Sequence, residues 1–310
     1  MKIHNINLET KLNEKLFHLA IGNFDGIHLG HKTIISKLVT DANNNNKPSA
    51  ILSFDPHPRQ FFSKEDKQYQ IISKDNKQNI LKKLGVDHFF SLNFDHSIAN
   101  LEPTEFIEKI IVEKLKINKL IVGYDFRFGK DRKGDIFMLK DFASIHGFVL
   151  EIIEPIKQKN TSEVYSSTAI RKAIVAGDFN KANSMLDYFW SMSGKIIEGD
   201  KKARAMNFPT ANMLPHEQVC PCKGVYAIQT FMKDKKYVGI ANFGVRPTVN
   251  GAKVLLETHL FDFSEDIYGK HLTVEFLTFI RGEKKFDSFA LLAKQIRKDV
   301  QTAKNYHIKK

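Results

Sequence analysis

Cysteine and long apolar runs are both scarce in this sequence. Its 310 residues include two cysteines, too few for a disulfide framework. Stretches such as Leu277–Ile280 are short and interrupted, whereas a membrane-spanning helix needs roughly 20 apolar residues. The first five residues lack the apolar core of a secretory signal. These absences argue against a disulfide-rich secreted protein and a helical membrane protein, and they predict a cytoplasmic one.

Acidic residues are outnumbered, with 35 Asp+Glu against 47 Lys+Arg and a net charge of +12. A basic chain favours anionic partners, which include nucleic acid, acidic lipid and phosphorylated metabolites. Lysines on helix faces, as in 81–84, are more often solvated surface. We therefore expect most of the charge to be surface, on a globular chain of about two domains.

The two halves of the chain differ in pattern. In the first, strand-like segments 17–21, 49–54 and 119–122 alternate with helical spacing, which predicts a parallel α/β sheet. The helical segments are 32–40 and the stretch from Phe106 to Leu115.

The second half contains short strand-like segments separated by turn residues, namely 224–230, 236–242, 254–260 and 272–279. They predict a small antiparallel barrel or sandwich. Ser288–Val300 reads as an amphipathic terminal helix, with Phe289, Leu292, Ile296 and Val300 on one side. We place the domain boundary near Asp187, giving domains 1–186 and 187–310.

A glycine-rich segment, 22–31, follows the first buried strand and opens a helix. Glycine lets the backbone approach a ligand closely, and a helix N-terminus offers N–H groups to phosphate. His28 and His31 can both face that phosphate and donate to oxygens whose charge grows in a transition state. A metal site is weaker, because no third ligand is near. A P-loop fails because Lys130 is followed by Asp131, and no dinucleotide-binding glycine motif occurs.

The segment resembles the His-x-Gly-His motif of nucleotidyltransferases, and more narrowly the adenylyltransferase module of bacterial bifunctional riboflavin kinase/FAD synthetases. Three further blocks agree in order, at 53–58, 122–129 and 166–171. The resemblance implies a Rossmann-like nucleotidyltransferase domain. It also implies attack of an FMN phosphate on the α-phosphorus of ATP, a nucleophile that is already ionised and needs no base.

The resemblance assigns roles to single residues in this domain. His28, His31 and Arg171 would be catalytic, with Arg171 at the leaving pyrophosphate. His57 and Phe62 would contact the flavin, although aromatic residues there are more often core. Residues for ATP and its phosphates would be Gly22, Asn23, Phe24, Asp25, Gly26, Gly30, Asp125, Ser167 and Thr168. Asp125 reads equally well as a turn former, and Ser166–Thr168 as a helix cap.

A second centre is the segment 208–212, which resembles the Pro-Thr-Ala-Asn motif of riboflavin kinases. Thr210 and Asn212 lie two apart, so in an extended segment their oxygens point to one side and suit Mg²⁺. Alone, this would be a polar turn after proline. Blocks that follow in the family's order are 224–227, 242–248, 257–263, 268–269 and 281–286.

In the kinase half the resemblance implies that Glu257 is the general base for the ribityl hydroxyl. Arg204 would bind ATP, and Asn242 and Arg281 would bind the flavin. Two family glycines are replaced by Ala203 and Asn207. The leading hypothesis is a bifunctional enzyme that makes FMN and then FAD from riboflavin, ATP and Mg²⁺. The alternative is an FMN adenylyltransferase with an impaired kinase domain.

A third hypothesis is a nucleic-acid-binding protein that uses the excess positive charge. The one basic cluster near a motif is interleaved with Asp131 and Asp135, and we interpret it as a lid over phosphates; it comprises Arg127, Lys130, Arg132 and Lys133. A zinc site at Cys220 and Cys222 has poor ligand spacing. We therefore expect small-molecule partners and neither nucleic acid nor membrane. The oligomeric state does not follow from the sequence.

Overall fold

The computed structural model describes residues 1–12, 16–63, 68–158, 162–197, 210–214, 217–233, 235–248 and 251–308. The chain divides into two compact units. Unit 1 contains 1–67 and 74–166, and unit 2 contains 68–73 and 167–310. The short segment 68–73 thus packs with unit 2 although both of its sequence neighbours belong to unit 1.

Unit 1 is built on a parallel sheet of six strands in the order β1-β4-β3-β2-β5-β6. The strands are β1 (Lys2–Ile6), β2 (Phe17–Ile21), β3 (Ser49–Asp55), β4 (His88–Asn93), β5 (Ile117–Gly123) and β6 (Val149–Ile153). The predicted α/β class is confirmed. The strands at 17–21, 49–54 and 119–122 lie where the sequence placed them.

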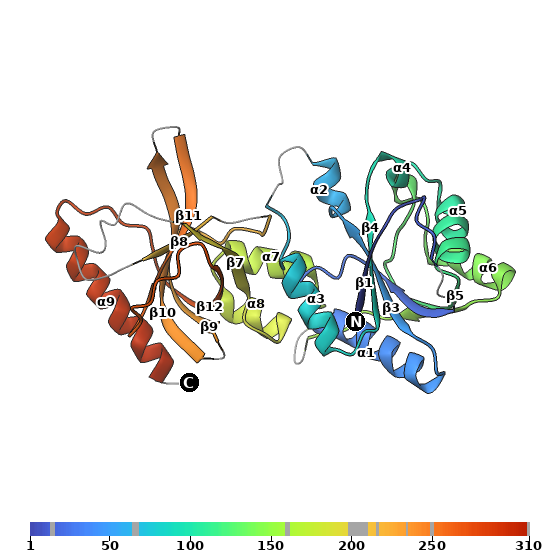
Figure 1. Cartoon of the computed structure of the whole chain (residues 1–310), viewed down its shortest axis with the longest axis horizontal. Helices are drawn as coiled ribbons and strands as arrows, with labels where there is room; N and C mark the ends of the chain where they lie inside the picture. Colours follow the sequence, from blue (N-terminus) through green and yellow to red (C-terminus); the bar gives the residue numbers. More distant parts are fainter. Residues whose placement is uncertain are drawn as a thin grey trace. The chain divides into compact units, whose positions relative to one another are not determined.

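Helices cover both faces of this sheet (Figure 1). On one face, Ile35 and Leu38 of the first helix pack on Ile51 and Ile121. On the other, Phe106 and Ile110 pack on the opposite set of strand residues. The helical segments of unit 1 are α1 (Leu29–Asn44), α2 (Pro58–Phe62), α3 (Lys74–Lys83), α4 (His96–Ala99), α5 (Pro103–Glu105), the π-helix η1 (Phe106–Lys114), the 3-10 turn η2 (Lys130–Arg132) and α6 (Ile136–His146).

The strand order places the direction change of the sheet between β2 and β5. From β2 the chain runs through β3 and β4 to one side, and then returns to β5 and β6 on the other. In an open parallel sheet, ligands bind beyond the carboxyl ends of the strands at such a point. Segment 22–31 leaves β2 and segment 124–129 leaves β5. Topology therefore brings two of the predicted motifs to one edge of the sheet.

Unit 2 is a closed antiparallel barrel with strand order β10-β11-β8-β7-β12-β9, so the barrel, and not a sandwich, is the observed form. Its strands are β7 (Ser191–Ile197), β8 (Ala211–Met213), β9 (Gly224–Met232), β10 (Lys235–Thr248), β11 (Gly251–Leu260) and β12 (His271–Gly282). Its helices are α7 (Ser167–Val175), α8 (Phe179–Leu186) and α9 (Phe289–Ile308).

The terminal helix α9 runs along the outside of the barrel (Figure 1). Ile296, Val300 and Ala303 pack against a cluster that contains Val225 and Ile240. The predicted apolar face is therefore confirmed in the middle of the helix. It fails at the first turn, where Phe289 is 68% exposed.

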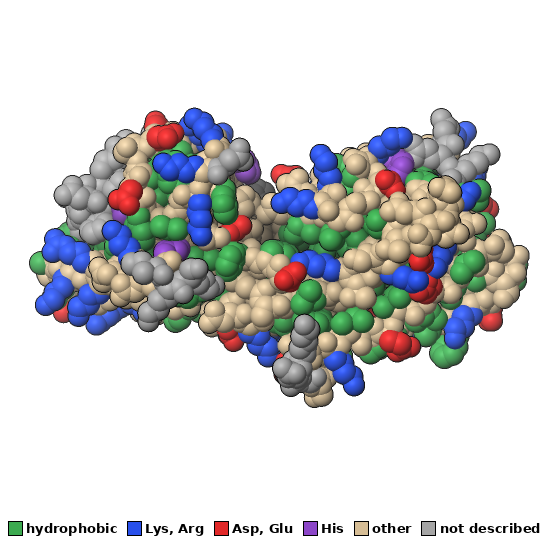
Figure 2. Space-filling view, turned by 90° about the horizontal axis from the view of Figure 1, so that it is seen from below, with side chains coloured by type: hydrophobic (Ala, Val, Ile, Leu, Met, Phe, Trp, Pro, Cys, Tyr) green, Lys and Arg blue, Asp and Glu red, His purple; other side chains and the backbone are tan. Residues whose placement is uncertain are grey.

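Lysine and arginine side chains spread over the face shown in Figure 2 and are interspersed with hydrophobic and acidic side chains. Within the described residues, no helix is long and apolar enough to cross a membrane. The scattered arrangement fits the interpretation of the net charge as solvated surface.

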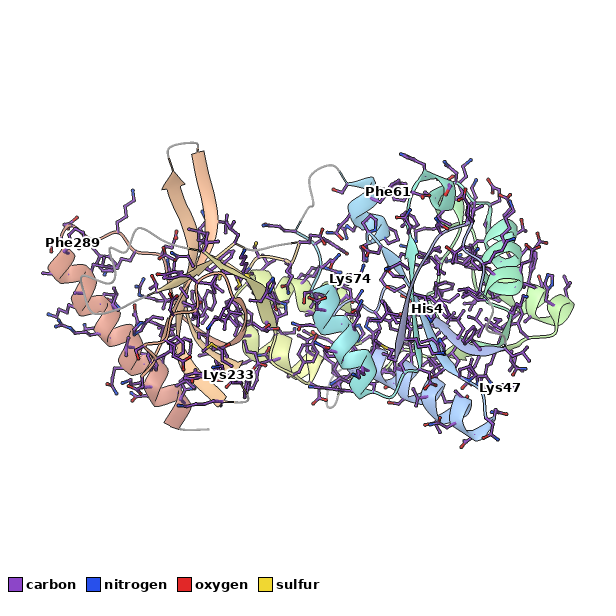
Figure 3. All side chains as sticks on the ribbon, in the orientation of Figure 1. His4, Lys47, Phe61, Lys74, Lys233 and Phe289 are labelled. Atoms are coloured by element: carbon purple, nitrogen blue, oxygen red, sulfur yellow. The ribbon has the colours of Figure 1, made fainter. Side chains whose placement is uncertain are left out.

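Trp190 anchors the segment 68–73 to the rest of unit 2. Its indole is fully buried, stacks on Phe179, packs at a tilt against Phe276, and donates from Nε1 to the carbonyl of Ile71 at 2.7 Å. We expect Trp190→Phe to lower the free energy of unfolding by about 1–3 kcal/mol through a lost hydrogen bond and a cavity. Thermal melts would show it. Phe289→Leu, a change at the exposed start of α9 labelled in Figure 3, should leave the midpoint nearly unchanged. Equal midpoints for both variants would contradict the prediction.

Candidate active sites

Segment 22–31 forms a tight turn between β2 and α1. Gly26 has φ 86°, which explains glycine there, and Phe24 and Ile27 also adopt positive φ, at 45° and 39°. Phe24 is buried, and its ring meets the His31 ring edge-on at 5.3 Å. A side chain at Gly22 would meet the Phe24 ring at 3.2 Å. The turn therefore combines a glycine in the left-handed region with two residues whose backbone is strained.

His28 and His31 come together at the N-terminus of α1. Their rings stack with centroids 3.7 Å apart and an interplanar angle of 16°. His28 is the N-cap residue, and its Nδ1 accepts from the backbone N–H of His31 at 3.3 Å. A neutral ring that accepts at Nδ1 carries its proton on Nε2. His28 is thus prepared to donate from Nε2 at a helix N-terminus, where anions are favoured.

The glycine between the two histidines has a packing reason. A Cβ at Gly30 would lie 3.2 Å from two atoms of the His28 ring and 3.4 Å from Cβ of Tyr165. The contacts with the ring are closer than ordinary packing, and the contact with Tyr165 is at its limit. A side chain at this position would therefore displace the His28 ring. Asp25 is buried in the same turn, with 3% of its surface exposed. The sequence pattern His-x-Gly-His therefore reflects a real steric requirement.

Asn23 presents a buried polar atom in this turn. Its Oδ1 has no hydrogen-bond partner among the described residues. A buried, unpaired side-chain oxygen is costly unless a ligand or water supplies a donor. This observation fits the prediction that Asn23 contacts the nucleotide.

Beyond β3, His57 caps the short helix α2, and its Nδ1 accepts from the N–H of Arg59 at 3.1 Å. On the same helix Phe62 is 69% exposed, and its ring meets Phe61 at 5.2 Å. Figure 3 labels Phe61 on this helix. An exposed aromatic ring suits a planar ligand better than a core position, and the assigned flavin contact of Phe62 stays a prediction.

The loop after β5 is closed by bonds of its own. Phe128 is buried, and its backbone exchanges hydrogen bonds of 3.2 and 3.0 Å with Gly134. Arg127 pairs with Asp135 at 3.1 Å, while Asp125 is exposed in the turn that follows the strand. The alternation of basic and acidic residues noted in the sequence thus produces local ion pairs. Both interpretations of Asp125, as a contact for ATP and as a turn former, stay open.

Ser167 and Thr168 form the first turn of α7, and Arg171 follows on the same helix in unit 2. The guanidinium of Arg171 stacks on the Tyr69 ring at 3.7 Å, and its Nε donates to the Tyr69 carbonyl at 3.0 Å. Stacking on an aromatic face and a hydrogen bond fix the plane of an arginine. The assigned phosphate-binding role of these three residues stays a prediction.

In the barrel, four predicted residues align across neighbouring strands. Glu257 of β11 is paired with Asn212 of β8 on one side and with Asn242 of β10 on the other. Asn242 is paired with Val225, which in turn is paired with Arg281 of β12. Residues directly opposite each other project from the same face of a sheet. At its Val225 and Arg281 end this row meets α9, since Val225 belongs to the cluster packed against that helix and Arg281 pairs with its Asp299.

The members of the row differ in burial and in bonding. Asn212 is 2% exposed, and its Oδ1 has no hydrogen-bond partner within the part of the chain that is described. Glu257 and Asn242 are half-buried. Arg281 forms a two-pronged ion pair with Asp299 of α9, with N–O distances of 2.8 to 3.0 Å. The structure thus shows Arg281 bound to the helix, and its assigned flavin contact stays a prediction.

The arrangement suits a hard cation with oxygen ligands. Mg²⁺ takes few protein oxygens and completes its shell with water and substrate phosphate. The Oδ1 of Asn212, which has no partner among the described residues, is such an oxygen. Thr210 is half-buried two residues earlier. Among the described residues, no cluster of three or more His, Cys, Asp or Glu side chains could hold a metal. Arg204, Ala203 and Asn207 lie outside the described residues.

Tyr69 and Lys77, which belong to none of the sequence motifs, contact predicted residues. Tyr69 holds Arg171, as described above. Lys77 of α3 donates from Nζ to the carbonyl of Asn23 at 2.9 Å. Lys77 lies in a helix of mostly polar residues, KDNKQNILKK, where one lysine looks like the next. Only the packing of α3 beside the turn distinguishes it.

Comparison with known proteins agrees with this geometry. The FAD synthetase family model matches residues 10–169, and the riboflavin kinase family model matches residues 186–307. The chain is 41% identical over 294 residues to a bifunctional riboflavin kinase/FMN adenylyltransferase of Haemophilus influenzae, covering 93% of each chain. It is 35% identical over 289 residues to the enzyme of the same description from Escherichia coli K12. That match covers 93% of this chain and 92% of the other.

A solved structure has the same fold over nearly the whole chain. It is described as a macrolide-efflux protein from Streptococcus pneumoniae, with a TM-score of 0.85 and 26% identity. The match covers 97% of this chain and 99% of that one.

Proposed function

The chain belongs to the family of bifunctional riboflavin kinase/FMN adenylyltransferases, and we propose how its residues divide the two reactions. As a family member it phosphorylates riboflavin to FMN with ATP, and transfers AMP from ATP to FMN to give FAD. Both family models match, so an adenylyltransferase without a kinase is not favoured. We assign AMP transfer to residues 1–186 and phosphorylation to residues 187–310.

The observation that carries the first assignment is the stacked histidine pair at the N-terminus of α1. An oxygen of the FMN phosphate attacks the α-phosphorus, the bond to the β-phosphate oxygen breaks, and pyrophosphate leaves. Nε2 of His28 and the N–H groups of the helix end neutralise charge on the α-phosphate. His31 shares that role, and Arg171 steadies the leaving pyrophosphate.

The remaining residues of this centre bind and orient the substrates. The exposed ring of Phe62 offers a surface for the flavin, with His57 at the start of the same helix. The Oδ1 of Asn23 accepts from the nucleotide. ATP is held by backbone and side chains of Gly22, Phe24, Asp25, Gly26, Gly30, Asp125, Ser167 and Thr168.

In the kinase centre, Glu257 takes the proton from the terminal ribityl hydroxyl as its oxygen attacks the γ-phosphorus and ADP leaves. The row supports this role because Glu257 lies between Asn212 and Asn242. Thr210 and Asn212 would hold Mg²⁺, which supplies charge neutralisation at the phosphates when bound. Asn242 and Arg281 are the flavin side of the row, and Arg204 is assigned to ATP.

The direct test is incubation with riboflavin, ATP and Mg²⁺, followed by chromatographic separation of the flavins. We expect FMN to appear first and FAD to follow. FAD formed only from added FMN would restore the adenylyltransferase alternative, with Ala203 and Asn207 as the first suspects. Salt-dependent binding of nucleic acid without turnover of either flavin would contradict the proposal altogether. We place the enzyme in the cytoplasm, because Cys220 and Cys222 are both free thiols.

A further inference from the structure

Lys77 reaches from the helix α3 to the turn that precedes the histidine pair. Its Nζ donates to the backbone carbonyl of Asn23 at 2.9 Å. Oγ of Ser53, at the end of β3, donates to the same oxygen at 3.2 Å. One carbonyl of the turn is thus held from two sides by two different elements of unit 1.

The turn needs to be held, because its backbone is strained. Phe24 and Ile27 have φ values of 45° and 39°, a region that residues with a Cβ seldom adopt. Such conformations persist only where surrounding contacts fix them. Asn23 precedes Phe24 directly, so the bonds to its carbonyl act at the first strained position. The same residue carries the buried side-chain Oδ1 that has no partner among the described residues.

Burial and neighbouring charges act in opposite directions on the pKa of the Lys77 ammonium, and burial is the larger influence. Burial is the largest influence and lowers the pKa of the ammonium, Asp25 and Asp55 raise it, and Lys74 of the same helix lowers it. Asp55 is itself paired with Lys74 at 2.6 Å. Asp25 is the buried carboxylate of the turn. In its protonated form, Lys77 places a positive charge in a segment where phosphate is expected to bind.

We propose that Lys77 is a positioning residue for AMP transfer, which acts by holding the Asn23 carbonyl and so the turn that leads into His28 and His31. The inference rests on the proposed function of that turn. Lys77 touches no reacting atom in this scheme. Its charge-assisted bond keeps the strained turn in the conformation that meets the transition state.

Lys77→Met tests the proposal, with Lys74→Met as its matched control. Both variants remove one lysine charge from α3, but Lys74 is exposed, bonded to Asp55 and labelled at the first turn of the helix in Figure 3. We expect Lys77→Met to lower kcat for FAD formation from FMN on the order of tenfold to a hundredfold. KM for ATP should change less, and FMN formation from riboflavin should be unchanged. Lys74→Met should leave both reactions within about twofold of wild type.

The pH profile adds a measurement that a purely structural contact would not move. Since burial lowers its pKa, the Lys77 ammonium loses its proton at a lower pH than an exposed lysine. FAD formation by the wild type should therefore fall on the alkaline side as that charge is lost. Lys77→Arg keeps a permanent charge, so we expect it to retain FAD formation and to lose this alkaline decline.

Two results would overturn the inference. One is FAD formation by a folded Lys77→Met variant within twofold of wild type. The other is an unchanged alkaline decline in Lys77→Arg, which decides the matter even if the methionine variant does not fold. If His28→Ala abolishes FAD formation while both Lys77 variants behave as wild type, only this inference fails. If the wild type makes no FAD at all, the proposed function fails instead.

Discussion

His28→Ala is expected to lower FAD formation from FMN and ATP by about a hundredfold to a thousandfold, the range seen when one preorganised donor is removed from a charged transition state. The reason is specific to the geometry. Nδ1 of His28 is occupied by the N–H of His31, so Nε2 is the donor. FMN formation from riboflavin should continue at the wild-type rate, because the barrel does not contain this residue. Separation of FMN and FAD by chromatography measures both reactions in one sample.

A second variant separates catalysis from helix capping. His28 is the N-cap residue of α1, and its loss could weaken the helix by about 1 kcal/mol. Asparagine is among the best N-cap residues, so His28→Asn should restore the cap without restoring the ring donor. We expect it to be as inactive in FAD formation as the alanine variant, with a melting temperature nearer wild type. His146→Ala, an exposed histidine in the last turn of α6, serves as the control. Recovery of FAD formation in the asparagine variant would assign the effect to capping.

The sequence predicted the elements with strong periodicity, and physical reasons explain the others. The segment 17–21, FHLAI, is a short apolar run, so composition alone identified it as a strand. The structure shows it buried along its whole length. Strand β1 reads KIHNI and is mostly exposed, which leaves no alternation to detect. Strand β7, SMSGKII, mixes small and polar residues because its neighbours in the barrel, and not its own pattern, decide its burial.

The candidate sites were predictable where chemistry shows in the residue types. Two histidines beside glycines indicate phosphate chemistry, and the stacking of their rings shows that they lie together. Contacts between residues far apart in the sequence are harder to predict. The alignment of Glu257 with Asn212 and Asn242 depends on strand register across three strands, and register is set by the closure of the barrel. Lys77 and Tyr69 act through backbone carbonyls, contacts that no side-chain pattern can reveal.

Glu257→Gln is expected to lower FMN formation from riboflavin by about a hundredfold to ten-thousandfold, the contribution of a positioned general base. Glutamine keeps the size of the side chain and its place between the two asparagines, but cannot accept the hydroxyl proton. FAD formation from supplied FMN should stay at the wild-type rate, the reverse of the His28 result. Glu265→Gln, an exposed carboxylate beyond the end of β11, should change neither reaction. If the Glu257→Gln enzyme still makes FMN at the wild-type rate, another group is the general base. The row of residues would then be a binding surface only.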